Sequence, residues 1–388
     1  MTRRIGILLY AIVAAATAVH AQPTPSLTPA EIAIHKAQDD IAKSPKHYPY
    51  YNSLAMAYAR RERETADPAY YLKAEEALRK SFAIEANNFE GLKVETYLLL
   101  GRQEYSKALE IAKKLNQQTP DDVAVYGYIA DANAELGNYQ DAVDAAQWML
   151  KIRPGNTPAL IRAGYLREVY GDLDGSLEVL RMAYDATPFQ ESEDRAWLLA
   201  RMAHVKLMTN DPNTAETFVN NALSIFPGYL YAVETLGQIR MAQHRYTDAA
   251  ELFRKVYAGA PRAENLFAVG EALFMAGKKD DAGKTFSEFE ALALKESAAA
   301  DNANRELIKY YADYAKAPAK ALQLAEREAL RRHDLYTLDS YAWSLAANDD
   351  YAHAQTQMQK ALATGVKDPR ILEHATAIAQ HVQRPAGQ

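Results

Sequence analysis

Apolar side chains recur three and four residues apart along most of the chain, a spacing that places them on one face of an α-helix. Residues 123–156 show the pattern most clearly, as two such faces separated by a short polar break. Gly137 lies in the break, where a left-handed backbone is needed and glycine adopts it without a Cβ penalty. Pro154 ends the second helical pattern because proline has no N–H to donate. This stretch therefore predicts a helical hairpin.

The same hairpin pattern returns at a regular period of about 34 residues. The proline that ends the second helix recurs at this interval in two series, Pro120, Pro154 and Pro188, then Pro227 and Pro261. The small residue inside the second helix recurs with it, at Ala108, Ala142 and Ser176, then at Ala215 and Ala249. A single hairpin cannot bury its apolar face alone, so these units are expected to stack on one another. The period and the small-residue pattern resemble the tetratricopeptide repeat (TPR).

This resemblance implies an all-α, right-handed superhelical solenoid of antiparallel helix pairs. We expect about nine repeats over residues 48–368, with a capping helix in residues 28–47 and another in residues 369–383, followed by a disordered tail at 384–388. Thr28, Pro29 and Glu31 form the pattern of a helix N-cap with a capping box.

Two segments depart from the repeat, and a third is hard to read. The first unit's turn is lengthened by about seven residues around 61–66. The step from Pro188 to Pro227 exceeds the repeat period, which indicates about five inserted residues near 191–195. The pattern is weakest over 297–334.

Residues 1–21 predict a signal peptide, with two arginines before an apolar run from Ile5 to Val19 and a cleavage site between Ala21 and Gln22. Residues 22–27 then form a linker. An uncleaved anchor is the alternative, although the run is shorter than the roughly 20 residues of a bilayer span. The mature chain has no integral membrane segment. The chain has no cysteine, which excludes disulfides, thiolate metal sites and a cysteine-linked lipid. We therefore expect export to the bacterial envelope, as a periplasmic or secreted protein.

Charge disfavours a nucleic-acid partner. Without Arg3 and Arg4 the chain carries 42 basic and 50 acidic side chains, a net charge of −8. Nucleic-acid affinity comes mainly from the neutralisation of phosphates, which needs basic patches that are absent from this sequence.

No motif supports catalysis, a cofactor or a metal ion. The string from Gly277 to Thr285 resembles a phosphate-binding loop, but its glycines are six positions apart and no strand precedes it. The loop from Gly171 to Gly175 lacks the further oxygen ligands of a calcium site. The histidines are scattered and no nucleophile motif occurs. We expect a non-enzymatic protein without cofactors.

The TPR resemblance implies a concave groove lined by the first helix of each unit. Carried over by position, the expected groove residues are Tyr97, Leu100, Ile161, Tyr165, Trp197, His204, Tyr231, Glu234, Gln238, Met241, Phe267, Glu271, Phe274, Tyr336 and Trp343. The alternative for each ring is a place in the core between units. Aromatic side chains with leucine and methionine between them suit a peptide. Acidic residues at equivalent positions, including Glu168 and Asp339, favour a neutral or basic partner over a C-terminal carboxylate.

We therefore expect a scaffold that binds a protein or peptide in its groove. A self-assembling component of an envelope complex is the alternative, and an unrecognised hydrolase is a third. The sequence identifies neither the partner nor the oligomeric state.

Overall fold

The computed structural model describes residues 27–382, which fold into twenty α-helices and one π-helical turn without any β-strand. The expected signal peptide (1–21), nearly all of the linker (22–27) and the tail (384–388) lie outside these residues. None of the helices in the described part is long and apolar enough to cross a membrane.

The helix bounds follow the predicted units closely. The first half contains α1 (Pro29–Lys43), α2 (Tyr48–Thr65), α3 (Ala69–Ile84), α4 (Phe89–Gly101), α5 (Tyr105–Gln118), α6 (Val123–Leu136), α7 (Tyr139–Ile152), α8 (Thr157–Val169), α9 (Leu173–Ala186) and α10 (Ser192–Met208). The second half contains α11 (Pro212–Ile225), α12 (Leu230–Ala242), α13 (Tyr246–Gly259), α14 (Ala263–Met275), α15 (Lys279–Glu296), α16 (Asn304–Lys309), the π-helical turn η1 (Tyr310–Tyr314), α17 (Pro318–Ala329), α18 (Leu335–Ala347), α19 (Tyr351–Leu362) and α20 (Pro369–Val382).

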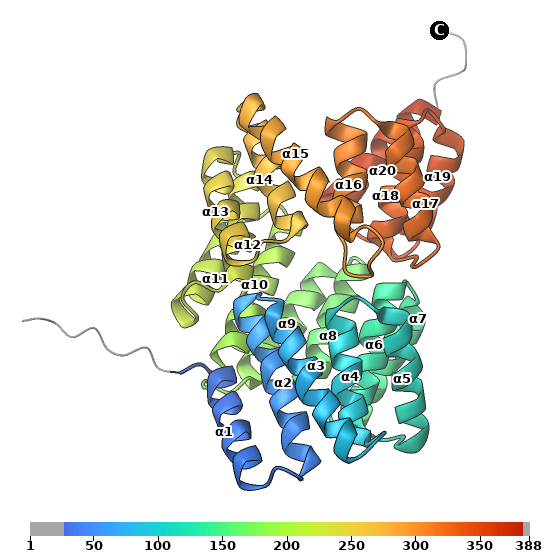
Figure 1. Ribbon diagram of the computed structural model, residues 1–388. Coiled ribbons are helices and arrows are strands. Elements are labelled where there is room, and N and C mark those ends of the chain that lie inside the picture. The colour runs from blue at the N-terminus through green and yellow to red at the C-terminus, as the bar shows by residue number, and fades with distance from the viewer. Residues whose placement is uncertain (1–26, 383–388) are drawn as a thin grey trace, which may run out of the picture.

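Consecutive helices from α2 to α19 pack as nine antiparallel pairs, and α1 and α20 cover the two ends (Figure 1). The expected all-α solenoid is therefore confirmed. In the reference unit, the Asp122 side chain caps α6 by accepting from the Val125 N–H at 3.1 Å. Gly137 ends α6 with φ +87°, in the left-handed region predicted for it.

The N-terminal cap has the predicted capping box. Thr28 Oγ1 accepts from the Glu31 N–H at 3.3 Å, and the Glu31 carboxylate accepts from the Thr28 N–H at 2.8 Å. The Ala30 N–H donates to Glu64 of α2 at 3.0 Å. Because these contacts satisfy N–H groups that a helix start leaves free, α1 begins at a defined residue and docks on α2.

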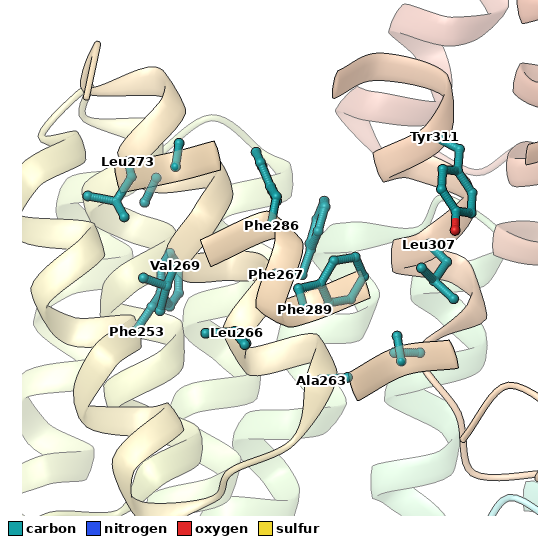
Figure 2. Packing of buried hydrophobic residues seen from close by; sticks show 14 of the residues in the cluster. Phe253, Ala263, Leu266, Phe267, Val269, Leu273, Phe286, Phe289, Leu307 and Tyr311 are labelled. Carbon is teal, nitrogen blue, oxygen red and sulfur yellow. The ribbon is translucent and has the colours of Figure 1, made fainter. Parts of the chain in front are cut away.

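The largest core cluster lies between α13 and α17, where three phenylalanines meet (Figure 2). The ring of Phe267 lies 5.8 Å from that of Phe286 and 5.2 Å from that of Phe289. Leu307 and Tyr311 of the next unit belong to the same cluster and are labelled in Figure 2. Burial of such large apolar side chains is the main stabilising term for stacked repeats, because each unit is covered by its neighbours.

The superhelix turns tightly enough for late units to contact early ones. The His333 N–H donates to the Leu136 carbonyl at 3.0 Å, and the Leu335 N–H donates to the buried Tyr139 hydroxyl at 2.7 Å. A Cβ on Gly137 would lie 2.4 Å from the His333 backbone. Residues 196 positions apart in sequence are thus in direct contact at what we call the seam, residues 136–139 and 333–335.

Candidate functional site

First helices of successive units lie against one another, in contact from α2 through α4 and α6 to α8, between α10 and α12, and from α16 through α18 to α20. In the C-terminal half, these helices and their neighbours enclose a pocket of about 240 Å³. Its walls come from α12, α14, α16, α18 and α20, so the second helices contribute nothing to it. We call it the inner pocket. Four predicted groove residues line it: Glu234, Phe267, Glu271 and Trp343.

One wall of the inner pocket is organised around Glu271. Lys309 of α16 forms an ion pair with its carboxylate, and the Tyr314 hydroxyl donates to it at 2.9 Å. Burial alone would raise the pKa of Glu271, but Lys309 and Tyr314 stabilise the charged form and lower the pKa below its usual value. Tyr314 reaches Glu271 from the π-helical turn, a feature often found at functional sites.

Two stacked aromatic rings also line the inner pocket. The Trp343 indole stacks on the His374 ring, with centroids 4.1 Å apart and an interplanar angle of 6°. The indole N–H donates to Asp313 of the π-helical turn at 2.7 Å. His374 Nδ1 lies 2.9 Å from the buried Asp339 carboxylate. These bonds fix both rings, so the stacked pair is preorganised for a flat or extended ligand group.

The inner pocket also has an acidic group of residues around Glu234. Burial, together with the neighbouring Glu264 and Glu306 carboxylates, raises the pKa of Glu234 to about 7. Glu264 is paired with Arg262. Among the described residues, Glu234 has no basic side chain within ion-pair distance, and its carboxylate accepts only from Gln238, at 3.3 Å. A cationic group placed here would stabilise the ionised form of Glu234, which no basic side chain of the described residues pairs with.

A second group of predicted residues meets farther along the inner face. The Trp197 and Tyr231 rings stack with centroids 6.4 Å apart. His204 lies 3.4 Å from Glu168, which is buried and paired with Arg201 at 2.6 Å. Burial would raise the pKa of Glu168, but Arg201 and His204 lower it below the usual value. This carboxylate is therefore neutralised by the protein itself, unlike Glu234.

The remaining predicted groove residues are distributed along the same helices without forming a second enclosed site. Most are half-buried, with one edge of the side chain against a core cluster. Residues of this kind are Tyr97, Ile161, Tyr165, Met241 and Tyr336, while Leu100 and Gln238 are also half-buried. Phe267 is only 5% exposed and belongs to the core cluster, whereas Phe274 is 41% exposed. The core interpretation of the aromatic pattern thus applies to some rings, such as Phe267, and the groove interpretation to others.

Several pocket residues were not among the predicted set. Arg305 and Lys309 lie on α16, in the region where the repeat pattern is weakest, and Arg370 and His374 lie on the C-terminal capping helix. Arg201 occupies a position of α10 that the TPR spacing assigns to no groove contact. Apart from their basic type, nothing in the sequence distinguishes these residues as pocket residues.

The motifs rejected from sequence serve helix starts and turns in the structure. Asp172 caps α9 by accepting from the Gly175 N–H at 3.0 Å. Gly277 precedes α15, and Gly283 lies within that helix. Within residues 27–382 no group of His, Asp and Glu side chains is arranged to hold a metal ion.

No protein-family model and no curated protein matches the chain. Solved structures of TPR-like helical repeat proteins do match. The human IFIT1 dimer with m7Gppp-AAAA superposes with a TM-score of 0.55 at 12% identity, over 86% of this chain and 85% of that one. The same dimer with PPP-AAAA gives 0.54 at 11% identity, over 86% and 87%. The APC/C Cut9–Hcn1 hetero-tetramer gives 0.51 at 13% identity, over 89% of this chain but only 59% of that one. At such identities the match establishes the fold alone.

Proposed function

We propose that this chain is a non-enzymatic scaffold that binds a basic peptide or protein segment along its inner face, with the inner pocket as the anchor point. The observation that carries the proposal is the convergence of five helices on one pocket where Glu234 lacks a basic partner within the described residues. A cation bound beside Glu234 would supply the counter-charge that this carboxyl lacks and would favour its ionised form, so a ligand of opposite sign is preferred.

The chemistry of the pocket suits an extended segment bearing a lysine or arginine. The charged head would lie between Glu234 and Glu264, and the apolar stem or a neighbouring ring would lie on Trp343. Farther along the inner face, the stacked rings of Trp197 and Tyr231 offer contacts for the following residues. The acidic balance of the whole chain favours the same partner and disfavours phosphate-rich ones.

Export through the signal peptide is part of the proposal, and a bacterial envelope is the expected compartment. The sequence features of residues 1–21 support it. Expression of the full chain in a bacterial host, followed by N-terminal sequencing of the periplasmic fraction, should give a chain that begins at Gln22. A chain that retains Met1 and stays with the membrane would instead favour the uncleaved anchor.

Binding can be tested with labelled peptides of equal length that carry lysine, glutamate or only neutral residues, together with an RNA oligonucleotide. We expect the lysine peptide to bind most tightly. Because hydrogen bonds to charged groups contribute about 1.5–3 kcal/mol, Glu234→Gln/Glu264→Gln should weaken it by at least about tenfold.

The matched control is Glu178→Gln/Glu251→Gln, which removes two exposed carboxylates from the second helices α9 and α13. It changes the net charge equally and should leave affinity within about twofold, because exposed charges away from the site are screened. Equal weakening by both variants would reduce the effect to net charge and contradict an anchor in the inner pocket. Tighter binding of the RNA than of any peptide would overturn the choice of partner.

A further inference from the structure

The two insertions that interrupt the repeat contact each other in the structure. Helix α2 has 18 residues and α10 has 17, whereas α4, α8, α12 and α14 have 13 each. The additional residues of α2 lie at its C-terminal end, and those of α10 lie at its N-terminal end, where the sequence period lengthens. Both extended ends meet across the superhelix, although 131 residues separate them in sequence.

The contact is made by charged side chains. Arg63 Nη2 lies 2.6 Å from Glu193 Oε2 and 2.6 Å from Asp194 Oδ1, and Arg60 forms an ion pair with Glu191. We call these five residues the clasp. Glu193 is fully buried, and its second oxygen accepts from the Tyr229 hydroxyl of the α12 N-cap at 2.6 Å. A buried carboxylate left without its cation is strongly disfavoured, so the clasp has a definite closed state.

Apolar packing holds the seam, which is the other contact between early and late units, but it does not hold the clasp. At the seam, buried Tyr139 and Val169 belong to one hydrophobic cluster with Leu335 and Leu338 of α18. The cluster around α2 contains only residues 54–98, all within the first two helix pairs. The N-terminal helices are therefore joined to α10 by ion pairs, while the seam is joined by buried apolar surface.

A wall of the inner pocket is also linked to an early unit. Arg262, at the start of α14, pairs with Glu264 of the pocket and lies 2.6 Å from Asp301. Asp301 belongs to the third irregular segment of the sequence, and Gln103 donates to it at 2.9 Å. All three departures from the repeat thus make contacts between units that are distant in sequence. Contacts of this kind are expected where a superhelix is held closed.

We propose that the clasp is an openable closure. When its ion pairs separate, the N-terminal helices move away from α10 while the seam stays intact, and the inner face becomes accessible to a larger partner. The opening itself is a property of the chain alone. Only its use in admitting a peptide rests on the proposed function.

Salt distinguishes the clasp from the seam. The Debye length falls from about 8 Å at 0.15 M to about 3 Å at 1 M salt, so partly exposed ion pairs weaken while apolar contacts persist. The side chains of Arg60 and Glu191 are 25% and 35% exposed, which leaves this pair open to screening. High salt should weaken the Arg60–Glu191 pair more than the buried Arg63–Glu193 pair. We therefore expect high salt to loosen the clasp in part and to spare the seam.

Distance measurements between spin labels test this directly, because the chain has no cysteine of its own. Exposed positions Lys80 and Asn220 report across the clasp, and Asn138 and Arg331 report across the seam, each pair replaced by cysteine. In 1 M salt the clasp pair should show a longer, broader distance distribution, and the seam pair should not. Unchanged distances across the clasp, or equal lengthening of both pairs, would overturn the proposal.

Charge reversal supplies the second test. Arg60→Glu should lengthen the clasp distance at low salt, and Arg60→Glu/Glu191→Arg should restore it, which misfolding would not allow. Arg102→Glu breaks an exposed ion pair with Glu75 inside the first pairs and should leave the distance unchanged. A lengthening with Arg102→Glu, or no rescue by the swap, would contradict a specific clasp.

Access to the inner face is read without any ligand. A single cysteine at Ser340, which lines the inner pocket, should react with a small maleimide at similar rates in all variants. A maleimide on a bulky polymer should react about two- to fivefold faster when Arg60→Glu is added, as expected for the loss of a partly exposed ion pair that holds a closure. Equal rates would show that the clasp does not control access. Failure of peptide binding would leave these rates and distances untouched, so the two proposals fail separately.

Discussion

Replacement of Gly137 by alanine tests the contact between early and late units, and Gly155 provides its matched control. Both glycines lie in left-handed backbone, with φ +87° and +74°. A Cβ on Gly137 would meet the His333 backbone at 2.4 Å, whereas a Cβ on Gly155 would have no heavy atom within 4 Å. The two substitutions therefore share the conformational cost and differ only in the collision.

The magnitudes follow from these two terms. Left-handed backbone costs an alanine roughly 1–2 kcal/mol, which is the whole effect expected for Gly155→Ala. In Gly137→Ala the backbone of residues 333–335 must also move, and its bonds to Leu136 and Tyr139 are lost at about 1 kcal/mol each. We expect Gly137→Ala to destabilise by about 3–4 kcal/mol, the sum of both terms.

Urea unfolding followed by circular dichroism gives the two free energies. Because repeat arrays can unfold in parts, amide exchange at His333 and Leu335 should be measured beside it. Both amides should exchange faster in Gly137→Ala than in Gly155→Ala. Unchanged exchange, with destabilisation of the two variants equal to within about 0.5 kcal/mol, the usual scatter of a substitution without a specific contact, would refute the seam.

Three further outcomes are expected. Phe289→Ala, in the core cluster, should lower the unfolding free energy by about 3–5 kcal/mol, while Phe189→Ala, 80% exposed, should change it by less than about 0.5 kcal/mol; similar values would contradict the core assignment. The pKa of Glu234 is raised from 4.5 to about 7 in the folded state. The folded state is therefore stabilised by the protonated carboxyl at a pH below 4.5, and this stabilisation is lost as the pH rises through 7. Glu234→Gln should therefore gain roughly 1–3 kcal/mol over wild type between pH 5 and 8, and parallel pH–stability curves would refute the shift. Arg201→Met should destabilise by about 3–5 kcal/mol in thermal or urea melts because it leaves Glu168 buried without its cation, and a neutral effect would show that the pair is solvated.

The repeat could be predicted from sequence because its causes are local. Gly137, Pro154 and the small residues Ala108 and Ala142 each mark a turn, a helix end or a close approach, and each recurs at a fixed interval. Local patterns of this kind give the nine helix pairs and the faces that pack between them.

The inner pocket could be predicted only in part. Glu234, Glu271 and Trp343 lie in units whose period is legible, so their place on the first helices follows from spacing. Arg305 and Lys309 lie in the weak unit, where a π-helical turn replaces the regular helix and the spacing carries no information.

The contact at the clasp could not be predicted from the sequence, for a different reason. Both insertions are visible in the sequence, around residues 61–66 and 191–195, but their contact is not. Whether residues 131 positions apart meet depends on the pitch of the superhelix, and the pitch is the sum of small rotations at every interface. A local sequence pattern carries no information about this accumulated rotation, so it does not predict the contact.

Fluorescence of Trp343 tests most directly whether a basic segment occupies the inner pocket. The chain has three tryptophans, so Trp148→Phe/Trp197→Phe leaves Trp343, stacked on His374, as the only indole. Titration with the lysine peptide should give a saturable change in its emission, with the dissociation constant that the binding assay gives for this same variant, and the glutamate peptide should give no change. Saturable peptide binding that leaves Trp343 emission unchanged would place the ligand elsewhere and contradict the account.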